Sequence, residues 1–204
     1  DKGQLNRQTY LASGAFVLGS GVWSMHFIGM LAFSVCSTAN YDKPITVLSM
    51  LPSFLASWVA LVLIAKERVT VWELVISGTL VGAGIGVMHY SGMAAVHKSL
   101  VLRFDPLIFS VSIVVAVTLS ISALWLRFEL TKRQIWSSRR IDFLSGSVVG
   151  IAITGMHYTG MKATHFLANP MSLQTIEDNS DLAISIASIT ILAIVVTGAG
   201  NAVL

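Results

Sequence analysis

The chain has 204 residues, of which 54% are hydrophobic and only 11% are charged. Soluble domains are roughly a quarter charged, so this composition nearly excludes a soluble fold. The formal net charge of +3 is small, and the single cysteine, Cys36, excludes a disulfide within the chain.

Six apolar stretches follow one another along the chain. Each is long enough to cross a bilayer as a helix, which takes about 20 residues, and a helix satisfies its own backbone in hydrocarbon. In chain order they span residues 10–35, 45–65, 71–96, 106–126, 141–167 and 182–204. We therefore predict an all-α integral membrane protein with six transmembrane helices. Pro52 is expected to kink the second helix or to mark a later start.

The chain also repeats itself. Residues 82–97 match residues 150–165 at an offset of 68, and residues 19–30 match the first of these segments at an offset of 63. Each repeat holds two helices, so all three insert with the same polarity and are parallel repeats. We predict one membrane domain over residues 1–204, with repeats at about 10–65, 71–126 and 141–204. The first residue is not methionine and the last residues are apolar, so we interpret the chain as a fragment of a longer protein.

Glycine divides the helices into two classes. Thirteen of the 16 glycines fall in the first helix of a repeat. Small residues let membrane helices approach closely. We therefore predict that the three first helices form an inner trio in a pseudo-threefold arrangement, with the second helices around them.

Lysine and arginine set the expected orientation. Nine of the 13 basic residues lie in connections on one side of the predicted bundle, and four lie on the other. The positive-inside rule places the nine in the cytoplasm. Both ends of the chain, including the C-terminus, are then cytoplasmic.

Three of the five histidines recur at one position of the repeats. His26, His89 and His157 each lie about 16 to 18 residues from the cytoplasmic end of a first helix, in the outer half of the membrane. Ionisable groups inside a bilayer are costly and face the bundle interior. We expect the three imidazoles to converge.

Methionine accompanies each of these histidines in the pattern M-H-x-x-G-M. Residues four apart share one helix face, so the second methionine can join the imidazole. The glycine three residues after each histidine shares that face and is expected to relieve crowding there. Cu(I) prefers soft sulfur, and imidazole accepts either copper oxidation state, whereas zinc more often takes cysteine or carboxylate. Taken singly, a buried His or Met is explained by packing, but three copies at one depth favour a metal site. The candidate copper ligands are His26, His89, His157, Met25, Met88, Met156, Met30, Met93 and Met161.

Four further residues have two open interpretations each. His97 and His165 lie two helical turns beyond His89 and His157, where they form a second, shallower site or meet water. Tyr90 and Tyr158 lie in the second shell of the metal or are interfacial aromatics. The sequence has no nucleophile–His–acid set and no phosphate-binding glycine loop, and nothing in it argues for nucleic acid as a partner.

Three segments spell the signature of a known family in decreasing fidelity. The sequence Met-His-Tyr-Thr occurs unchanged at residues 156–159 and with a final Ser at residues 88–91. Residues 25–28 match it only in part, because Phe27 replaces the Tyr. With these copies the whole chain resembles the MHYT domain, a bacterial integral membrane sensor built from three tandem two-helix repeats.

The resemblance implies a multi-pass sensor of the bacterial inner membrane, with its site in the periplasmic half. It implies copper bound through the Met-His pairs of the three motifs, with Met30, Met93 and Met161 as additional sulfurs. The expected signal is a diatomic gas (O₂, NO or CO), redox state or copper itself, passed to cytoplasmic cyclic-di-GMP or other signalling domains in cis. Because such output domains lie outside this chain, the chain itself is not expected to be an enzyme.

Two other functions stay open at this point. One is a membrane metallo-oxidoreductase that uses the same site with an open coordination position. The other is a b-type haem protein with two of the histidines as axial ligands. The oligomeric state is also open.

Overall fold

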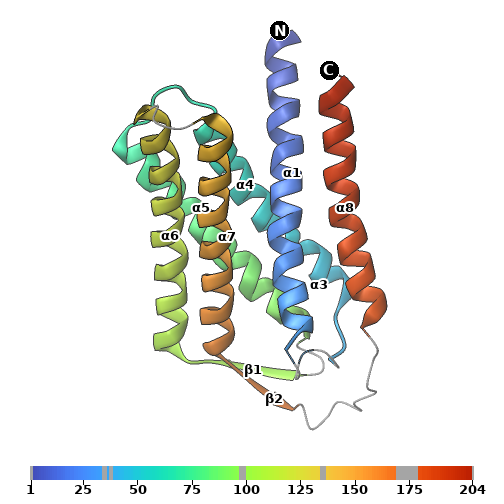
Figure 1. Cartoon of the computed structure of the whole chain (residues 1–204). Coiled ribbons are helices and arrows are strands. Elements are labelled where there is room, and N and C mark those ends of the chain that lie inside the picture. The colour runs from blue at the N-terminus through green and yellow to red at the C-terminus, as the bar shows by residue number, and fades with distance from the viewer. Residues whose placement is uncertain are drawn as a thin grey trace.

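The structure is a computed structural model that describes residues 2–33, 36, 39–96, 100–133, 137–168 and 179–203. Its helices run side by side in one bundle, with both ends of the chain at the same end (Figure 1). In the described part of the chain the helices are α1 (Lys2–Leu31), α3 (Lys43–Leu48), α4 (Met50–Ile64), α5 (Val71–Met93), α6 (Pro106–Arg133), α7 (Ser138–Lys162) and α8 (Ser180–Val203), and a short 3₁₀ turn, Ala94–Val96, follows α5.

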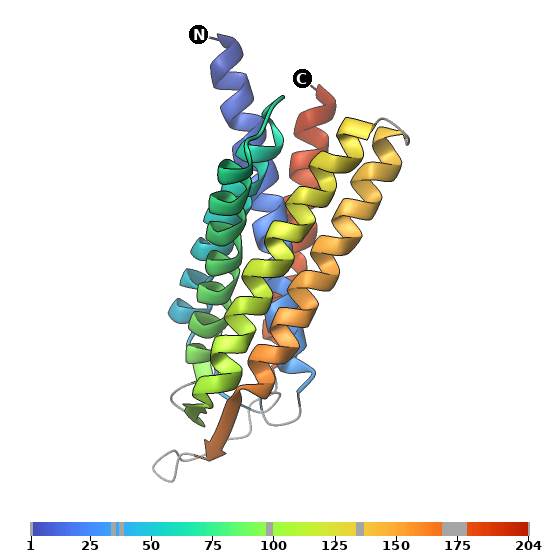
Figure 2. The ribbon, with the colours of Figure 1, turned by 90° about the vertical axis from the view of Figure 1, so that its left-hand side faces the viewer.

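The predicted all-α membrane class is confirmed. Five spans are long and apolar enough to cross a membrane, with α3 and α4 counted together as one span. α7 is not among them, because even its uncharged stretch, residues 143–160, is rich in Gly, Ser and Thr. It nevertheless packs along α6 over the length of the bundle (Figure 2).

The second predicted helix is broken rather than continuous. α3 ends and α4 begins at Ser49, and Pro52 lies in the first turn of α4, where a missing N–H costs no helical hydrogen bond. The break is tied to α1, because the indole of Trp23 donates to the carbonyl of Thr46 at 2.9 Å and to the Ser49 hydroxyl at 3.2 Å. The proline therefore marks a later start, one of the two outcomes expected.

Two short strands close the end of the bundle opposite the chain termini. β1 (Leu100–Phe104) precedes α6, and β2 (Thr164–Ala168) follows α7. They pair antiparallel, with Arg103 opposite His165. The sequence did not predict this pair, because the second strand continues an apolar stretch that we assigned to a helix.

Outer helices separate the inner ones in the first two repeats. α4 packs against both α1 and α5, and α6 packs against both α5 and α7. α8 packs along α1, where Ser24 hydrogen-bonds Thr190, and Figure 1 shows α1 between α7 and α8. The pseudo-threefold arrangement is therefore complete at two of its three outer positions.

Glycines on the inner helices show the same difference between the first two repeats and the third. A Cβ added to Gly19 would lie 2.9 Å from the backbone of Phe54 in α4, and one added to Gly82 would lie 2.5 Å from that of Val117 in α6. In the part of the chain that the structure describes, a Cβ added to the equivalent Gly150 in α7 would meet nothing within 4 Å. Glycine thus permits backbone contact in two repeats, whereas the third leaves this face of α7 uncovered.

Candidate metal centre

Three histidines from three inner helices form one buried cluster. His26, His89 and His157 are 0%, 1% and 2% exposed. Each lies within five residues of the end of its helix, α1, α5 or α7. One nitrogen from each side chain lies within 4.8 Å of the other two. The repeats therefore bring these imidazoles together; we call them the histidine cluster.

The Nδ1 atoms face the centre of the cluster. The Nδ1 of His26 lies 3.0 Å from that of His89 and 3.3 Å from that of His157. The ring centroids are 4.8 to 5.3 Å apart, and the ring planes cross at 72° to 89°. The three rings are thus arranged like the blades of a propeller around the pseudo-threefold axis.

Hydrogen bonds among the rings cannot satisfy all three central nitrogens. A nitrogen of a neutral imidazole is either a donor or an acceptor. Among three such atoms at least two have the same role, so at least one of the three pairs cannot form a hydrogen bond. A cation that receives all three lone pairs removes this mismatch, and the chemistry of the donor set therefore fits a bound metal.

The glycine of each motif faces the histidine of another repeat. A Cβ on Gly92 would overlap the Nε2 of His26, and one on Gly160 would overlap that of His89. Gly29 stands in the same relation to His157, which closes the cycle. We expected this glycine to relieve crowding beside its own histidine, and the structure shows that it makes room for a neighbour's.

The outer nitrogens of the cluster have no polar partner. The Nε2 atoms of all three histidines are buried and lack a hydrogen bond within the described part of the chain. Because each one faces a glycine, the position and tilt of the rings are set by packing rather than by hydrogen bonds.

The methionines of the motifs belong mostly to the hydrophobic core of the bundle. Five of the six candidate sulfur ligands are buried in one hydrophobic cluster: Met30, Met88, Met93, Met156 and Met161. Met25 is only partly buried and lines an open groove between α1 and α7. The Sδ of Met93 also accepts a hydrogen bond from Thr164 of β2 at 3.4 Å.

The aromatic residue after each histidine has a different environment in each repeat. Phe27 is buried, with its ring 4.9 Å from that of His26. The Tyr90 hydroxyl hydrogen-bonds Ser112 of α6 at 2.6 Å, whereas Tyr158 is 63% exposed. The two tyrosines therefore do not share one role, and only Tyr90 is held by an outer helix.

The remaining polar candidates lie outside the histidine cluster. His165 is exposed on β2, and His97 lies outside the described residues. Cys36 is buried, and burial raises the pKa of its thiol to about 12. Cys36 is not part of the group of potential metal ligands that the three histidines form.

Comparison with known proteins places these features in a family. The profile of the bacterial signalling protein N-terminal repeat, MHYT, matches residues 19–77, 82–137 and 150–204. The chain is 43% identical over 161 residues to the bifunctional diguanylate cyclase/cyclic di-GMP phosphodiesterase MucR of Pseudomonas aeruginosa, covering 78% of this chain and 23% of that protein. It is 34% identical over 169 residues to the cyclic di-GMP phosphodiesterase NbdA of the same organism, covering 81% and 22%.

A more distant bacterium supplies a third relative. The signaling protein YkoW of Bacillus subtilis is 33% identical over 165 residues, which is 79% of this chain and 20% of that protein. The matched region thus spans 20% to 23% of the length of these three relatives. No solved structure matches the chain.

Proposed function

Because this chain belongs to the MHYT family of bacterial signalling proteins, we propose that it is a membrane-embedded sensor domain that binds copper through the histidine cluster. The observation that carries this proposal is the convergence of three buried Nδ1 atoms from three repeats. Burying three imidazoles in hydrocarbon is costly unless a partner satisfies them. A metal ion is the partner that serves all three at once.

The spacing of the nitrogens supports a single ion. Metal–imidazole bonds are about 2.0–2.1 Å, so three nitrogens in a plane around one ion lie about 3.5 Å apart. The two observed separations are 3.0 and 3.3 Å. Only a small outward movement of the rings is needed to accommodate an ion, so His26, His89 and His157 would hold it.

Copper is favoured by the residues around the cluster. Five buried methionines supply thioether sulfur, which is a soft ligand suited to Cu(I). In the described part of the chain neither a cysteine nor a carboxylate joins the three histidines, so the ligands common in structural zinc sites are missing. When bound, copper would supply a redox-active centre with affinity for small diatomic ligands.

A haem is less compatible with this arrangement. Two axial imidazoles of a haem lie on opposite faces of a flat macrocycle. Here a third imidazole lies 5.2 to 5.3 Å from each of its partners, in the space that the macrocycle would need. We therefore favour one metal ion over haem, and favour sensing over oxidoreductase turnover because the relatives are signalling proteins.

The direction of signalling follows from the charges at the two ends of the bundle. Arg127, Arg133, Arg139 and Arg140 lie at the end that also holds both chain termini, which the positive-inside rule assigns to the cytoplasm of a bacterial inner membrane. The histidine cluster then lies in the periplasmic half. In this proposal α8 leads to cytoplasmic output domains like the cyclic-di-GMP enzymes named in the relatives, and the signal is a diatomic gas, redox state or copper itself.

Single substitutions measured for copper and for stability test the ligand assignment. We expect the His89→Ala and His157→Ala variants to lose most of their bound copper. The His165→Ala variant should keep its copper, because His165 is exposed and lies outside the cluster. A histidine that only packs would cost about 1–3 kcal/mol when removed and lower copper indirectly. Copper per chain is therefore measured together with thermal stability. If His89→Ala remains folded with a full copper content, the assignment is wrong.

A further inference from the structure

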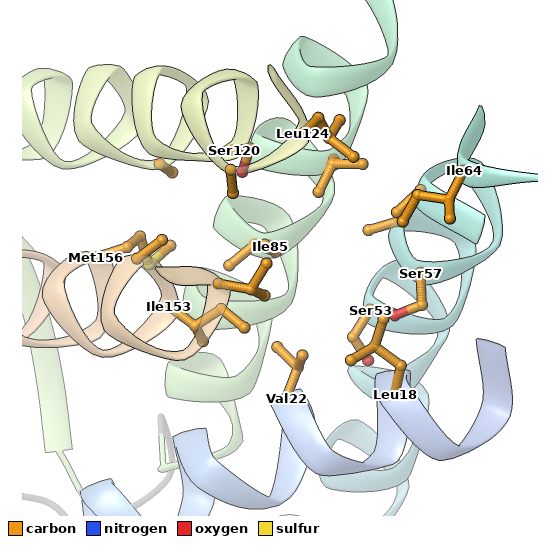
Figure 3. Close-up of a pocket in the computed structure, with 17 residues that line it drawn as sticks. Leu18, Val22, Ser53, Ser57, Ile64, Ile85, Ser120, Leu124, Ile153 and Met156 are labelled. Carbon is orange, nitrogen blue, oxygen red and sulfur yellow. The ribbon is translucent and has the colours of Figure 1, made fainter. Parts of the chain in front are cut away.

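The inner helices present only apolar side chains to the space on the side of the histidine cluster that faces the chain termini. Val22, Ile85 and Ile153 each precede a histidine of the cluster by four residues, so they form a layer one helical turn below it. Leu18, Val81 and Val149 form a second layer one turn further. All six side chains line one cavity of about 90 Å³ on the axis of the bundle (Figure 3).

Small residues of the outer helices create this space. α4 and α6 face it with alanine and serine, contributing Ser53, Ala56, Ser57, Ala60, Ala116, Ser120 and Ala123. The hydroxyl of Ser53 is satisfied within the protein, since it hydrogen-bonds the carbonyls of Gly19 at 3.0 Å and of Met50 at 2.7 Å. A buried water needs two to four polar partners, and apart from Ser57 and Ser120 the other lining residues are apolar, so the cavity favours an apolar occupant.

A groove adjoins the cavity on the side of the missing outer contact, and a wall of shared side chains lies between the two. This groove, between α1 and α7, shares Leu18, Val22, Val149 and Ile153 with the cavity. Glycines line the outer part of this groove, and added Cβ atoms at Gly21, Gly146 and Gly150 would meet nothing within 4 Å. The described residues that line the groove come from α1 and α7, and apart from Thr154 they are apolar or glycine, which suits contact with lipid.

We propose that this axial cavity binds a small apolar molecule dissolved in the bilayer, of the size of a diatomic gas, which enters laterally between α1 and α7. An engineered apolar cavity of about 150 Å³ holds benzene or xenon, so 90 Å³ suits a diatomic molecule or xenon and is too small for an acyl chain. Apolar gases are more concentrated in lipid than in water, so lateral entry from the bilayer is favoured over entry from water.

The position of the cavity connects it to the candidate metal centre. Met156 is 1% exposed, lines the cavity and directly precedes His157. A molecule bound there lies one helical turn from the histidine cluster without crossing a polar layer. The binding step needs no metal, whereas its role in signalling rests on the proposed function.

Xenon pressure on the metal-free chain with labelled isoleucine methyl groups tests the binding step. We expect the methyl resonances of Ile85 and Ile153 to shift and saturate as xenon rises. Ile76 and Ile151 are exposed on the bundle surface and should show only the linear drift caused by xenon in lipid. Linear drift at all four methyl groups would overturn the proposal.

Two substitutions on α7 test the cavity and the wall that it shares with the groove. Ala152→Leu fills the cavity, and Val149→Phe places a larger side chain in the wall that the cavity shares with the groove. Each substitution should therefore abolish the saturable shifts. Val87→Phe, the same change at an exposed position of α5, should keep them. Saturable shifts that persist in either folded α7 variant would contradict the assignment.

Copper content distinguishes this proposal from the proposed function. The two α7 variants should bind as much copper per chain as the wild type, because neither residue belongs to the histidine cluster. Xenon binding without copper binding would overturn the metal site and leave the cavity intact. A phospholipid that copurifies with the wild type, blocks the xenon shifts and is lost from Val149→Phe would assign the space to an acyl chain instead.

Discussion

The first two repeats and the third use the same motif in unequal surroundings. At the histidine end all three are alike, because each motif glycine faces the imidazole of another repeat. Seven residues before each histidine they differ. Gly19 and Gly82 meet the backbone of an outer helix, whereas Gly150 meets nothing within 4 Å. The symmetry is therefore strict around the histidine cluster and relaxed towards the end that holds the chain termini.

The aromatic residue that follows each histidine of the cluster also differs in its surroundings from one repeat to the next. Phe27 is buried, Tyr90 bonds to α6, and Tyr158 faces outward. What separates the repeats is the outer helix: α4 and α6 cover their inner partners, and α8 lies against α1 instead. In the described part of the chain the first two repeats are therefore covered by their outer helices, whereas the third leaves a seam between α1 and α7.

The largest loss of copper affinity is expected from substitution of a motif glycine, where the three repeats are alike. In Gly160→Ala the added methyl would overlap His89, which must move out of the cluster. We expect copper affinity to fall about 10–100-fold, as for residues that orient metal ligands, and stability to fall by about 1–3 kcal/mol. Copper titration and thermal unfolding measure the two effects.

The control for that change lies on the same helix. A Cβ on Gly155 would sit 3.9 Å from Leu119, an ordinary contact. Gly155→Ala should therefore bind copper like the wild type. Equal copper affinity in the two variants would show that the packing of glycine on histidine does not position the site.

Substitution of Gly82 and of Gly150 should have different effects on the free energy of unfolding, and this difference is smaller than the effect of Gly160→Ala. In Gly82→Ala the methyl meets the backbone of Val117 at 2.5 Å, and separating α5 from α6 should cost about 1–3 kcal/mol. Gly150→Ala should be neutral or stabilise by up to about 1 kcal/mol, because alanine is the better helix former. Unfolding in mild detergent compares them. Equal destabilisation would mean that α8 packs on α7 in solution and that the seam is closed.

The smallest effect concerns the two tyrosines. Tyr90→Phe removes the hydrogen bond to Ser112 and should cost about 0.5–1.5 kcal/mol. Tyr158→Phe should change stability by less than the error of the measurement, because that side chain is exposed. A larger loss from Tyr158→Phe would indicate that its hydroxyl has a partner when the protein is in a membrane.

Periodicity and repetition were sufficient to predict much of this architecture. The long apolar stretches predicted the helices, and the matched positions of His26, His89 and His157 anticipated that the three would lie at one depth. The break at Ser49 was visible only as Pro52 nearby, because a proline in a first turn looks like one inside a helix. The strand pair was missed, since pairing between residues 100–104 and 164–168 depends on contacts far apart in the sequence.

The open third repeat could not be read from the sequence either. Gly150 matches Gly82 in the motif alignment, and we expected such glycines to let the three first helices pack on one another as an inner trio, not to meet an outer helix. Whether a glycine is used for contact depends on where the next helix packs. Likewise, the pattern M-H-x-x-G-M placed the glycine on the face of its own histidine, and only the assembled bundle shows that it accommodates the histidine of another repeat.

X-ray absorption at the copper edge of the purified, copper-loaded chain tests the central claim most directly. The account predicts one copper per chain, with imidazole scattering from about three nitrogen ligands near 2 Å, and loss of that signal in His157→Ala. A shell of sulfur and oxygen without imidazole, or an imidazole signal that His157→Ala leaves unchanged, would contradict it.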